Sequence, residues 1–418
     1  MLRNGYVPTA CMVLLAAAMV GCGSSSSSST STTAPLTGIK KRVLLSNQSA
    51  NSVNILDASR DTVSSKNITV TAPTKMLTAS GKTLVLQSGR NTVTVIDNAT
   101  EAATFTPSLI GPPSDIAITP DGKFGWVAER ASGGVQFVGT ADGSVSPTLI
   151  SIPNARRVVM SPNGAKVLVF SDPLSQVPPN TNTFFVIDTN SKVVTPITSP
   201  SLDQPFTAVF GTSDTQAFIL NCGPQCGGTL ASVVSVDFSG ATPVFSANVP
   251  VPAATVGLLN GTNLYVAGTP VTPPPIPPSA VCPLSHCGWL TIINVGSLTP
   301  GTPIPITDGL HEKMSLANSR LYIGAGGCSV DPGTAVNSVR GCLTIFNTTT
   351  PGTKFPEESA FRQNFDVTGF RPISGRNIMY VIQGGEIDIF DTTTNALATG
   401  ITPLDVVGKA FDVVQIDP

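Results

Sequence analysis

One stretch of the chain, residues 114–139, constrains the fold more than any other, because its pattern recurs along most of the sequence. It reads SDIAITPDGKFGWVAERASGGVQFVG, and its alternating side chains predict three short strands at 116–119, 124–128 and 135–138. Pro120 and Gly122 are typical of the turn between the first two strands, since proline presets φ and glycine accepts a positive φ. The stretch therefore predicts short strands joined by tight turns.

The second and third strands of this unit recur in eight copies. We expect the strand pairs at 43–47 with 52–57, 83–87 with 92–97, 124–128 with 135–138, 166–170 with 184–188, 217–221 with 233–237, 264–267 with 289–294, 321–324 with 343–347, and 379–382 with 386–391. Every third strand except the one at 135–138 ends in Asp or Asn, whose side chain can accept hydrogen bonds from backbone N–H groups two or three residues later. We interpret this column as turn chemistry and not as a set of catalytic groups.

A four-stranded unit that repeats about every 40–50 residues is typical of a β-propeller blade. The first copy lacks its first strand, and residues 410–418 at the C-terminus form one strand too many. Pairing the two would complete the first blade and remove the open sheet edges. The sequence therefore predicts an all-β fold, a single closed β-propeller with eight blades of four antiparallel strands. A ring of seven blades with one degenerate copy is the alternative.

Several of these segments resemble the YVTN-type β-propeller repeats, which are related to lactonase-like and surface-layer propellers. The resemblance rests on residues 91–97, 120–122, 161–164 and 264–267, and it covers essentially everything after residue 40. It implies the fold. It implies little about function, because such repeats encode packing and turns.

The N-terminal 22 residues form no part of the predicted fold. Arg3, the apolar run 13–20 and the tetrad ending in Cys22 are typical of a signal peptide, and the tetrad resembles a bacterial lipobox, which implies lipidation of Cys22. An ordinary signal peptide is the alternative. Residues 23–40 predict a Ser/Thr-rich tether, and residues 41–418 the propeller domain.

The same resemblance implies where the chain resides. Gly23 stands where Asp would signal retention at the inner membrane, so we expect an exported lipoprotein of the bacterial cell envelope, at the outer membrane or cell surface with its head in the periplasm or outside. Two or three acyl chains would hold it on a membrane. The chain carries a net charge of −2 and only 11% charged residues, which argues against nucleic-acid binding. We expect a monomer.

Six of the eight cysteines form local couples. We expect disulfides at Cys222–Cys226, Cys282–Cys287 and Cys328–Cys342. An even number of cysteines in an exported chain favours disulfides. A zinc site is the rival interpretation, but it needs about four ligands at one point, whereas these couples lie in separate repeats.

Candidate binding residues gather on one predicted face. The loops between second and third strands are long at 171–183, 222–232, 268–288 and 325–341, and they share a face with the segments that lead into each first strand. Charged side chains in those segments would ring the channel mouth: Lys75, Asp115, Arg156, Arg157, His311, Glu312, Lys313, Asp366 and Lys409. Such a rim could bind a small anion or a sugar. A solvated rim of incidental charges is the alternative.

These features favour a binding or scaffold module that recognises an unknown protein or glycan through its disulfide-braced face. A lactonase-like hydrolase with a metal near the channel mouth and a structural envelope protein without a discrete ligand are the alternatives. We assign no catalytic residue and expect no cofactor, with calcium or zinc left open. The chain contains only two histidines and no Gly-x-Ser-x-Gly elbow, so whether it is an enzyme stays undecided.

Overall fold

The computed structural model describes residues 36–172, 182–271, 287–328, 342–354, 366–399, 404 and 406–418. Within it, Thr37–Pro418 forms one compact unit. The expected signal peptide, Cys22 and Cys282 lie outside the described residues. Among the residues that are described, none belongs to a helix long and apolar enough to span a bilayer.

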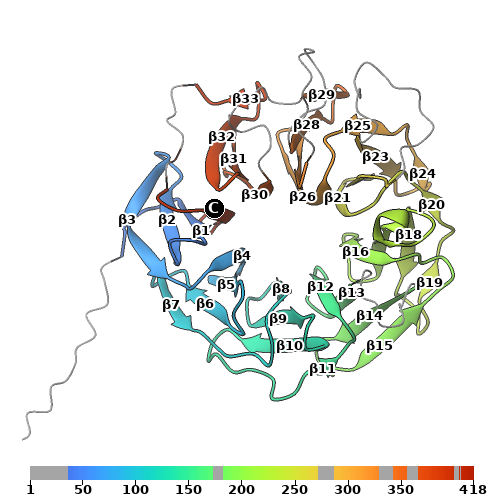
Figure 1. Cartoon of the computed structure of the whole chain (residues 1–418), viewed down its shortest axis with the longest axis horizontal. Helices are drawn as coiled ribbons and strands as arrows, with labels where there is room; N and C mark the ends of the chain where they lie inside the picture. The colour runs from blue at the N-terminus through green and yellow to red at the C-terminus, as the bar shows by residue number, and fades with distance from the viewer. Residues whose placement is uncertain are drawn as a thin grey trace, which may run out of the picture. The chain divides into compact units, whose positions relative to one another are not determined.

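The unit is a closed ring of eight antiparallel sheets, each built on a path of four strands, which confirms the eight-bladed propeller and excludes the seven-bladed alternative (Figure 1). The strands nearest the centre, from the first blade to the eighth, are β34 (Ala410–Gln415), β4 (Pro73–Ala79), β8 (Asp115–Ile118), β12 (Ala155–Met160), β16 (Pro205–Phe210), β21 (Val256–Asn260), β26 (Leu310–Ala317) and β30 (Val367–Pro372). The second strands are β1 (Arg42–Asn47), β5 (Lys82–Gln87), β9 (Phe124–Glu129), β13 (Lys166–Ser171), β17 (Gln216–Asn221), β22 (Asn263–Gly268), β27 (Arg320–Gly326) and β31 (Ile378–Gln383).

The third strands are β2 (Ser52–Asp57), β6 (Val93–Asp97), β10 (Gly134–Gly139), β14 (Thr183–Asp188), β18 (Ser232–Asp237), β23 (Gly288–Asn294), β28 (Leu343–Asn347) and β32 (Glu386–Asp391). The outer strands are β3 (Thr62–Thr69), β7 (Ala102–Phe105), β11 (Ile150–Ser151), β15 (Val194–Thr198), β19 (Val244–Phe245), β24 (Thr299–Pro300), β29 (Gly352–Lys354) and β33 (Ala396–Leu397). Two further short strands, β20 (Val249–Pro250) and β25 (Ile304–Ile306), pair with β18 and β23, and a 3-10 turn η1 spans Gly223–Cys226.

The C-terminal strand closes the ring as the sequence predicts. Strand β34 pairs antiparallel with β1, with Leu45 opposite Val413, so the first blade combines both ends of the unit. The guanidinium of Arg42 donates two hydrogen bonds to the carboxylate of Asp417, at 2.7 and 2.8 Å. Figure 1 shows the C-terminus beside β1.

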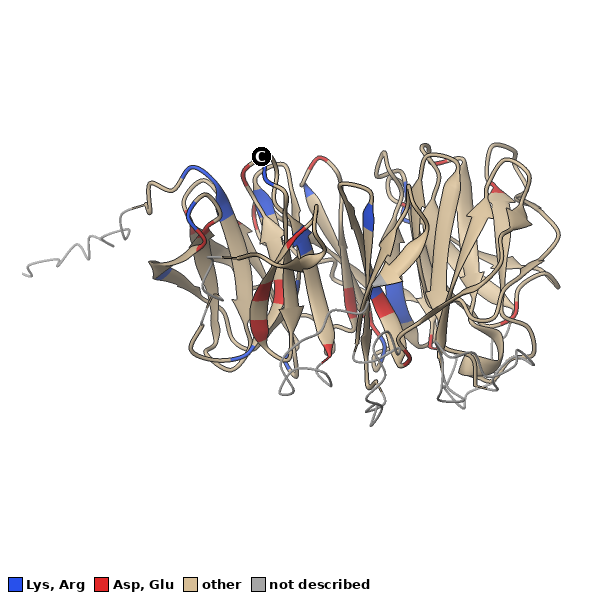
Figure 2. Cartoon of the chain, turned by 90° about the horizontal axis from the view of Figure 1, so that it is seen from above, with Lys and Arg blue, Asp and Glu red and all other residues tan. Residues whose placement is uncertain are grey.

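The core lies between neighbouring blades. One cluster joins the third and fourth blades and includes Trp126, Val167 and Ile187, all with no exposed surface. Charged residues occupy only a small part of the ribbon (Figure 2). Burial of this apolar surface is the main force that holds the blades together.

The Asp and Asn column behaves as expected from turn chemistry. Asp97 Oδ1 accepts hydrogen bonds from the N–H groups of Ala99 and Thr100, at 2.9 and 3.0 Å. Asp188 does the same with Ser191, and that backbone hydrogen bond lowers the pKa of the Asp188 carboxyl. The column therefore stabilises the turns into the outer strands.

The compact unit begins four residues before the predicted domain boundary at residue 41. Thr37 donates to the Glu101 carboxylate through both its N–H group, at 2.8 Å, and its hydroxyl, at 2.6 Å. Ile39 packs against the core between the first two blades. The end of the predicted tether is thus held by polar and apolar contacts that its Ser/Thr-rich composition did not indicate.

Candidate binding site at the channel mouth

In the fourth to seventh blades the second strand ends, and the third begins, at one edge of the ring, where the sequence predicts the long inserts between β13 and β14, β17 and β18, β22 and β23, and β27 and β28. Residues 173–181, 272–286 and 329–341 of these inserts lie outside the described residues. Because successive strands in a blade are antiparallel, this edge also receives the segments that lead into the inner strands. We call this edge the insert face.

The inner strands start on the insert face with an irregular register. In six blades the pairing with the second strand shifts near the first residues of the inner strand. In three of them the extra residue is Arg156, Phe206 or Glu312. A bulge re-aims a side chain that regular pairing would direct elsewhere. These three residues come together at the channel mouth.

An ion pair connects two blades that are not neighbours. The Arg157 guanidinium, from β12 in the fourth blade, donates to the carboxylate of Glu312, from β26 in the seventh. The Arg156 guanidinium lies 3.5 Å from the same Glu312 oxygen. The side chains of Arg156, Arg157 and Glu312 are 25, 17 and 39% exposed, so a solute can reach them.

The ring of Phe206 packs against the guanidinium groups of both arginines. Its ring centroid lies 4.8 Å from the Arg156 guanidinium carbon and 4.2 Å from that of Arg157. Phe206 itself is buried against Cys222 and Cys226, which form a disulfide. Cation–π contacts of this kind hold a guanidinium in place without neutralising it. The disulfide-braced insert of the fifth blade therefore positions the arginine pair.

The site carries an excess of positive charge. Two guanidinium groups share the single Glu312 carboxylate, and burial together with the charge of Arg157 lowers the pKa of Arg156. Nearby charges are paired separately: Arg130 lies 2.9 Å from Asp172, and Lys75 lies 2.6 Å from Asp115. The arrangement is therefore electrostatically suited to an additional anion.

The other rim residues predicted from the sequence make local contacts. Asp115 accepts from the Val158 N–H at 3.1 Å, which joins the third and fourth blades. Asp366 accepts from the Gly327 N–H at 2.7 Å, beside Cys328. Lys409 is exposed, and its backbone N–H donates to Asn47 Oδ1 at 3.1 Å. These residues hold the loops of the insert face and do not join the arginine cluster.

His311 lies inside the protein and not on the rim. Its side chain has no exposed surface, and burial lowers its pKa to about 4, so the imidazole is neutral at physiological pH. The ring occupies the space beside Gly288, where a Cβ atom would stand 2.6 Å from the imidazole Cε1. The sequence predicted His311 on the rim together with Glu312, but the bulge between His311 and Lys313 places the two side chains in different surroundings.

Two of the three expected disulfides are present, Cys222–Cys226 and Cys328–Cys342. Cys282, which belongs to the third expected disulfide, lies outside the described residues. The part of the chain that the structure describes holds no group of three or more His, Cys, Asp or Glu side chains placed to bind a metal ion.

Comparison with known proteins agrees on the architecture. A search of protein-family profiles and a search of curated proteins both found no match. Among solved structures, dihydro-heme d1 dehydrogenase NirN in complex with DHE gives a TM-score of 0.64 at 10% identity, over 90% of this chain and 75% of that one. Apo AztD from Citrobacter koseri gives 0.56 at 12% identity, over 90% and 97% of the two chains. Kuenenia stuttgartiensis hydrazine synthase gives 0.55 at 16%, over 81% and 96%.

The comparisons establish a β-propeller. At such low identities the likeness extends to the fold alone, because one propeller fold hosts many unrelated functions. The YVTN resemblance and its lactonase-like branch stay predictions. The site of this propeller must therefore be interpreted from its own residues.

Sequence reasoning missed Phe206 and the pairing of the arginines with Glu312. Arg157 and Glu312 are 155 residues apart, and they lie on blades that are not adjacent. A signal was present: Phe206 stands at the position of its inner strand that Arg156 and Glu312 occupy in theirs. Aligning the bulged residues of the repeats would have shown which side chains share the channel mouth.

Proposed function

We propose that this propeller is an extracytoplasmic binding module that recognises an acidic ligand at the channel mouth on its insert face. The observation that carries the proposal is the sharing of one carboxylate, Glu312, by two guanidinium groups, Arg156 and Arg157. A carboxylate or phosphate on the ligand would accept hydrogen bonds from the donors that Glu312 leaves over. An acidic glycan or an acidic protein segment has the required chemistry.

In this proposal Glu312 competes with the ligand. It occupies part of the guanidinium surface in the free protein, and an arriving anion either shares the arginines with it or displaces it. Removing its charge strengthens ligand binding, while removing the arginines weakens it. Phe206 keeps both guanidinium groups in place, which lowers the entropy lost on binding.

Isothermal titration with trigalacturonate and with citrate tests the proposal. The double variant Arg156→Gln with Arg157→Gln should bind at least about 10-fold more weakly than wild type, whereas Glu312→Gln should bind several-fold more tightly. Arg60→Gln is the matched control, because Arg60 is a surface arginine with an 80% exposed side chain in a turn of the first blade. The proposal would be contradicted if wild type bound neither trigalacturonate nor citrate, or if the double variant bound them as tightly as wild type.

The cellular location belongs to the same proposal. Two disulfides support an oxidising compartment, since such bonds are rare in reducing cytosol. We infer export and lipid anchoring through Cys22 from the N-terminal sequence. Incorporation of labelled palmitate into wild type, and its loss in Cys22→Ala, is the expected result. An unlabelled wild-type protein would leave an ordinary signal peptide as the better interpretation.

A further inference from the structure

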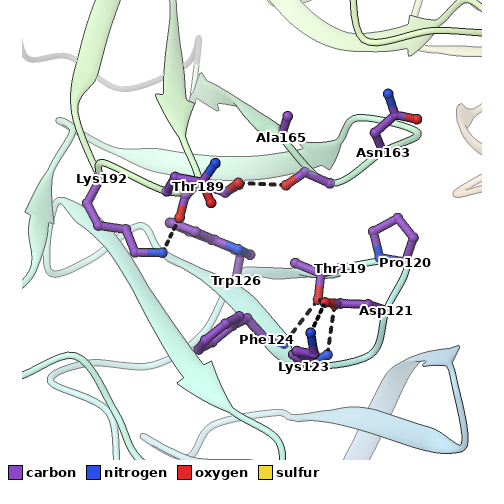
Figure 3. A pocket seen from close by; sticks show the side chains of 12 residues that line it. Thr119, Pro120, Asp121, Lys123, Phe124, Trp126, Asn163, Ala165, Thr189 and Lys192 are labelled. Atoms are coloured by element: carbon purple, nitrogen blue, oxygen red, sulfur yellow. Dashed lines mark hydrogen bonds and ion pairs between the residues drawn. The ribbon is translucent and has the colours of Figure 1, made fainter.

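A second cavity lies between the third and fourth blades, at the edge of the ring opposite the insert face. It has a volume of about 340 Å³. Its walls come from the β8–β9 and β12–β13 hairpins and the β14–β15 turn, which stand at the other ends of the strands from the inserts. Thr119, Phe124, Trp126, Asn163, Thr189 and Lys192 are among its lining residues (Figure 3).

Trp126 presents an unused hydrogen-bond donor to this cavity. Its side chain has no exposed surface, and among the described residues its indole nitrogen has no hydrogen-bond partner. Figure 3 shows the indole nitrogen facing the middle of the pocket. A buried N–H without a partner is destabilising, so its presence calls for an acceptor.

The neighbouring hydroxyl groups are already engaged. Thr189 donates its hydroxyl proton to the Gly164 carbonyl at 2.7 Å, and Thr119 donates its own to Asp121 Oδ1 at 2.6 Å. Neither hydroxyl donates a hydrogen bond into the cavity, and no described group accepts one from the Trp126 indole. The indole N–H is therefore one donor left to a ligand, beside polar side chains such as Asn163 that also line the cavity.

A lysine that lies against aromatic rings lines the cavity. The Lys192 ammonium lies 4.5 Å from the ring centroid of Phe137, 4.9 Å from that of Trp126 and 5.3 Å from that of Phe124. It also donates to the Thr189 carbonyl. Because this positive charge already lies near the three rings, a cationic ligand is disfavoured.

Phe124 offers an apolar platform beside these polar groups. Phe124 lines the cavity and is 38% exposed, whereas Trp126 is fully buried. An aromatic face that remains accessible, an orphaned N–H and a volume of monosaccharide to disaccharide size occur together. Carbohydrates match this combination, since one sugar face exposes C–H groups and its edge carries acceptor oxygens.

We propose that this cavity binds a neutral or acidic sugar unit. The C–H face of the sugar lies on the Phe124 ring, and a hydroxyl or carboxylate oxygen accepts the Trp126 N–H once the side chains that bury the indole move aside. The site shares no residue with the arginine cluster of the insert face. It is therefore a second binding function, independent of the first.

The tryptophan content of the chain makes the test direct. There are only two tryptophans, Trp126 and Trp289, so a protein labelled with 15N at the indole nitrogens should give two side-chain signals. Trp289 lies on β23 in the sixth blade, away from the cavity, and serves as an internal reference. Trp289→Phe identifies the signals without altering the cavity.

D-glucose, D-galacturonate and D-glucosamine are the ligands to titrate. We expect glucose or galacturonate to move the Trp126 signal downfield, because its N–H gains an acceptor, while the Trp289 signal stays in place. Glucosamine should bind most weakly. Phe124→Ala should weaken binding at least about 5-fold, whereas Val244→Ala, at a side chain 65% exposed on β19, should not change it.

Two results would overturn the proposal: a Trp126 signal that none of the three sugars moves, or sugar affinity that Phe124→Ala leaves unchanged. The double variant of Arg156 and Arg157 should retain the Trp126 response. Loss of binding at the insert face and loss of sugar binding here are therefore distinguishable.

Discussion

The carboxylate of Asp61 in the first blade accepts two hydrogen bonds from the guanidinium of Arg376 in the eighth, at 2.6 and 2.7 Å, although 315 residues separate them. The Tyr380 hydroxyl donates to the same carboxylate at 2.5 Å. Asp61 has a positive φ of 54°, in the turn between β2 and β3. This turn conformation directs its side chain toward the preceding blade, where it helps to close the ring.

The same turn position connects other neighbouring blades. Glu101, with φ of 51°, contacts Arg42 of the first blade from the second. Lys192, with φ of 63°, lies over the aromatic rings of the third blade from the fourth. Asn395, with φ of 58°, accepts from the Arg320 side chain of the seventh blade at 2.9 Å. We call this residue the latch position, since in each case it joins its blade to the preceding one.

Removal of a latch carboxylate should destabilise the ring. Asp61→Ala leaves the Arg376 guanidinium and the Tyr380 hydroxyl without their acceptor, at a site where the Asp61 side chain is only 6% exposed. We expect the free energy of unfolding to fall by about 2–4 kcal/mol in urea titrations. Asp142→Ala, which removes an exposed turn aspartate bound to Ser144, should lower it by less than about 1 kcal/mol. If the two substitutions lowered the free energy of unfolding equally, the contact between the blades at Asp61 would contribute no stability beyond that of an ordinary turn aspartate.

Glu129 should make the stability depend on pH. Its side chain has no exposed surface; one carboxylate oxygen accepts from the Gly111 N–H at 2.5 Å, while the other has no partner among the described residues. Burial raises the pKa of the Glu129 carboxyl to about 7. The folded protein therefore binds a proton more tightly than the unfolded chain, and stability falls as the pH rises from about 4.5 through about 7.

The substitution Glu129→Gln should abolish the loss of stability that occurs as the pH rises. Glutamine keeps the acceptor for Gly111 and carries no charge, like Gln87 at the same place in the second blade, which donates to the Thr71 carbonyl. The variant should be more stable than wild type by about 3 kcal/mol near pH 8 and nearly equal to it near pH 4. Urea unfolding at both pH values measures this difference. A pH-independent difference would mean that Glu129 does not titrate in this range.

The repeat explains why so much of the fold is predictable and so little of the site. Strand pairs, the Asp and Asn turns and closure by residues 410–418 depend on patterns local to one repeat, so the sequence carries them directly. The contact of Arg157 with Glu312 and the burial of His311 depend on bulges, whose geometry a pattern of apolar residues does not specify. The cavity beside Trp126 arises between two blades, each of which alone predicts only a buried strand.

The two described disulfides should contribute unequally to the stability of the protein. Cys328 and Cys342 are 14 residues apart, and Cys222 and Cys226 only 4. Restriction of the unfolded chain grows with loop length, so removing the first bond should destabilise the protein by about 3 kcal/mol and removing the second by about 2 kcal/mol. Thermal unfolding of the paired Cys→Ser variants measures both.

Loss of the Cys222–Cys226 disulfide should also weaken ligand binding at the channel mouth. Phe206 packs against this bond and carries the arginine pair, so citrate binding should weaken several-fold in the Cys222→Ser, Cys226→Ser variant. The Cys328, Cys342 variant is the control, because its bond lies in the seventh blade and does not contact Phe206. Equal weakening in both variants would point to a general loss of stability.

The C-terminal strand should be indispensable for folding. Residues 410–415 supply the inner strand of the first blade, and Asp412 also accepts from the Met76 N–H of the second blade at 2.8 Å. Deleting residues 408–418 would expose the edge of β1 and uncover apolar side chains that include Leu45, which lies opposite Val413. We expect the truncated protein to aggregate and to show no cooperative thermal transition, and a synthetic peptide of residues 408–418 to restore one. Asp417→Asn keeps the strand and removes only the charge opposite Arg42, so it should unfold cooperatively with a loss of about 1–2 kcal/mol. A truncated protein that unfolds cooperatively at the wild-type midpoint would show that seven complete blades and an open first blade suffice for stability.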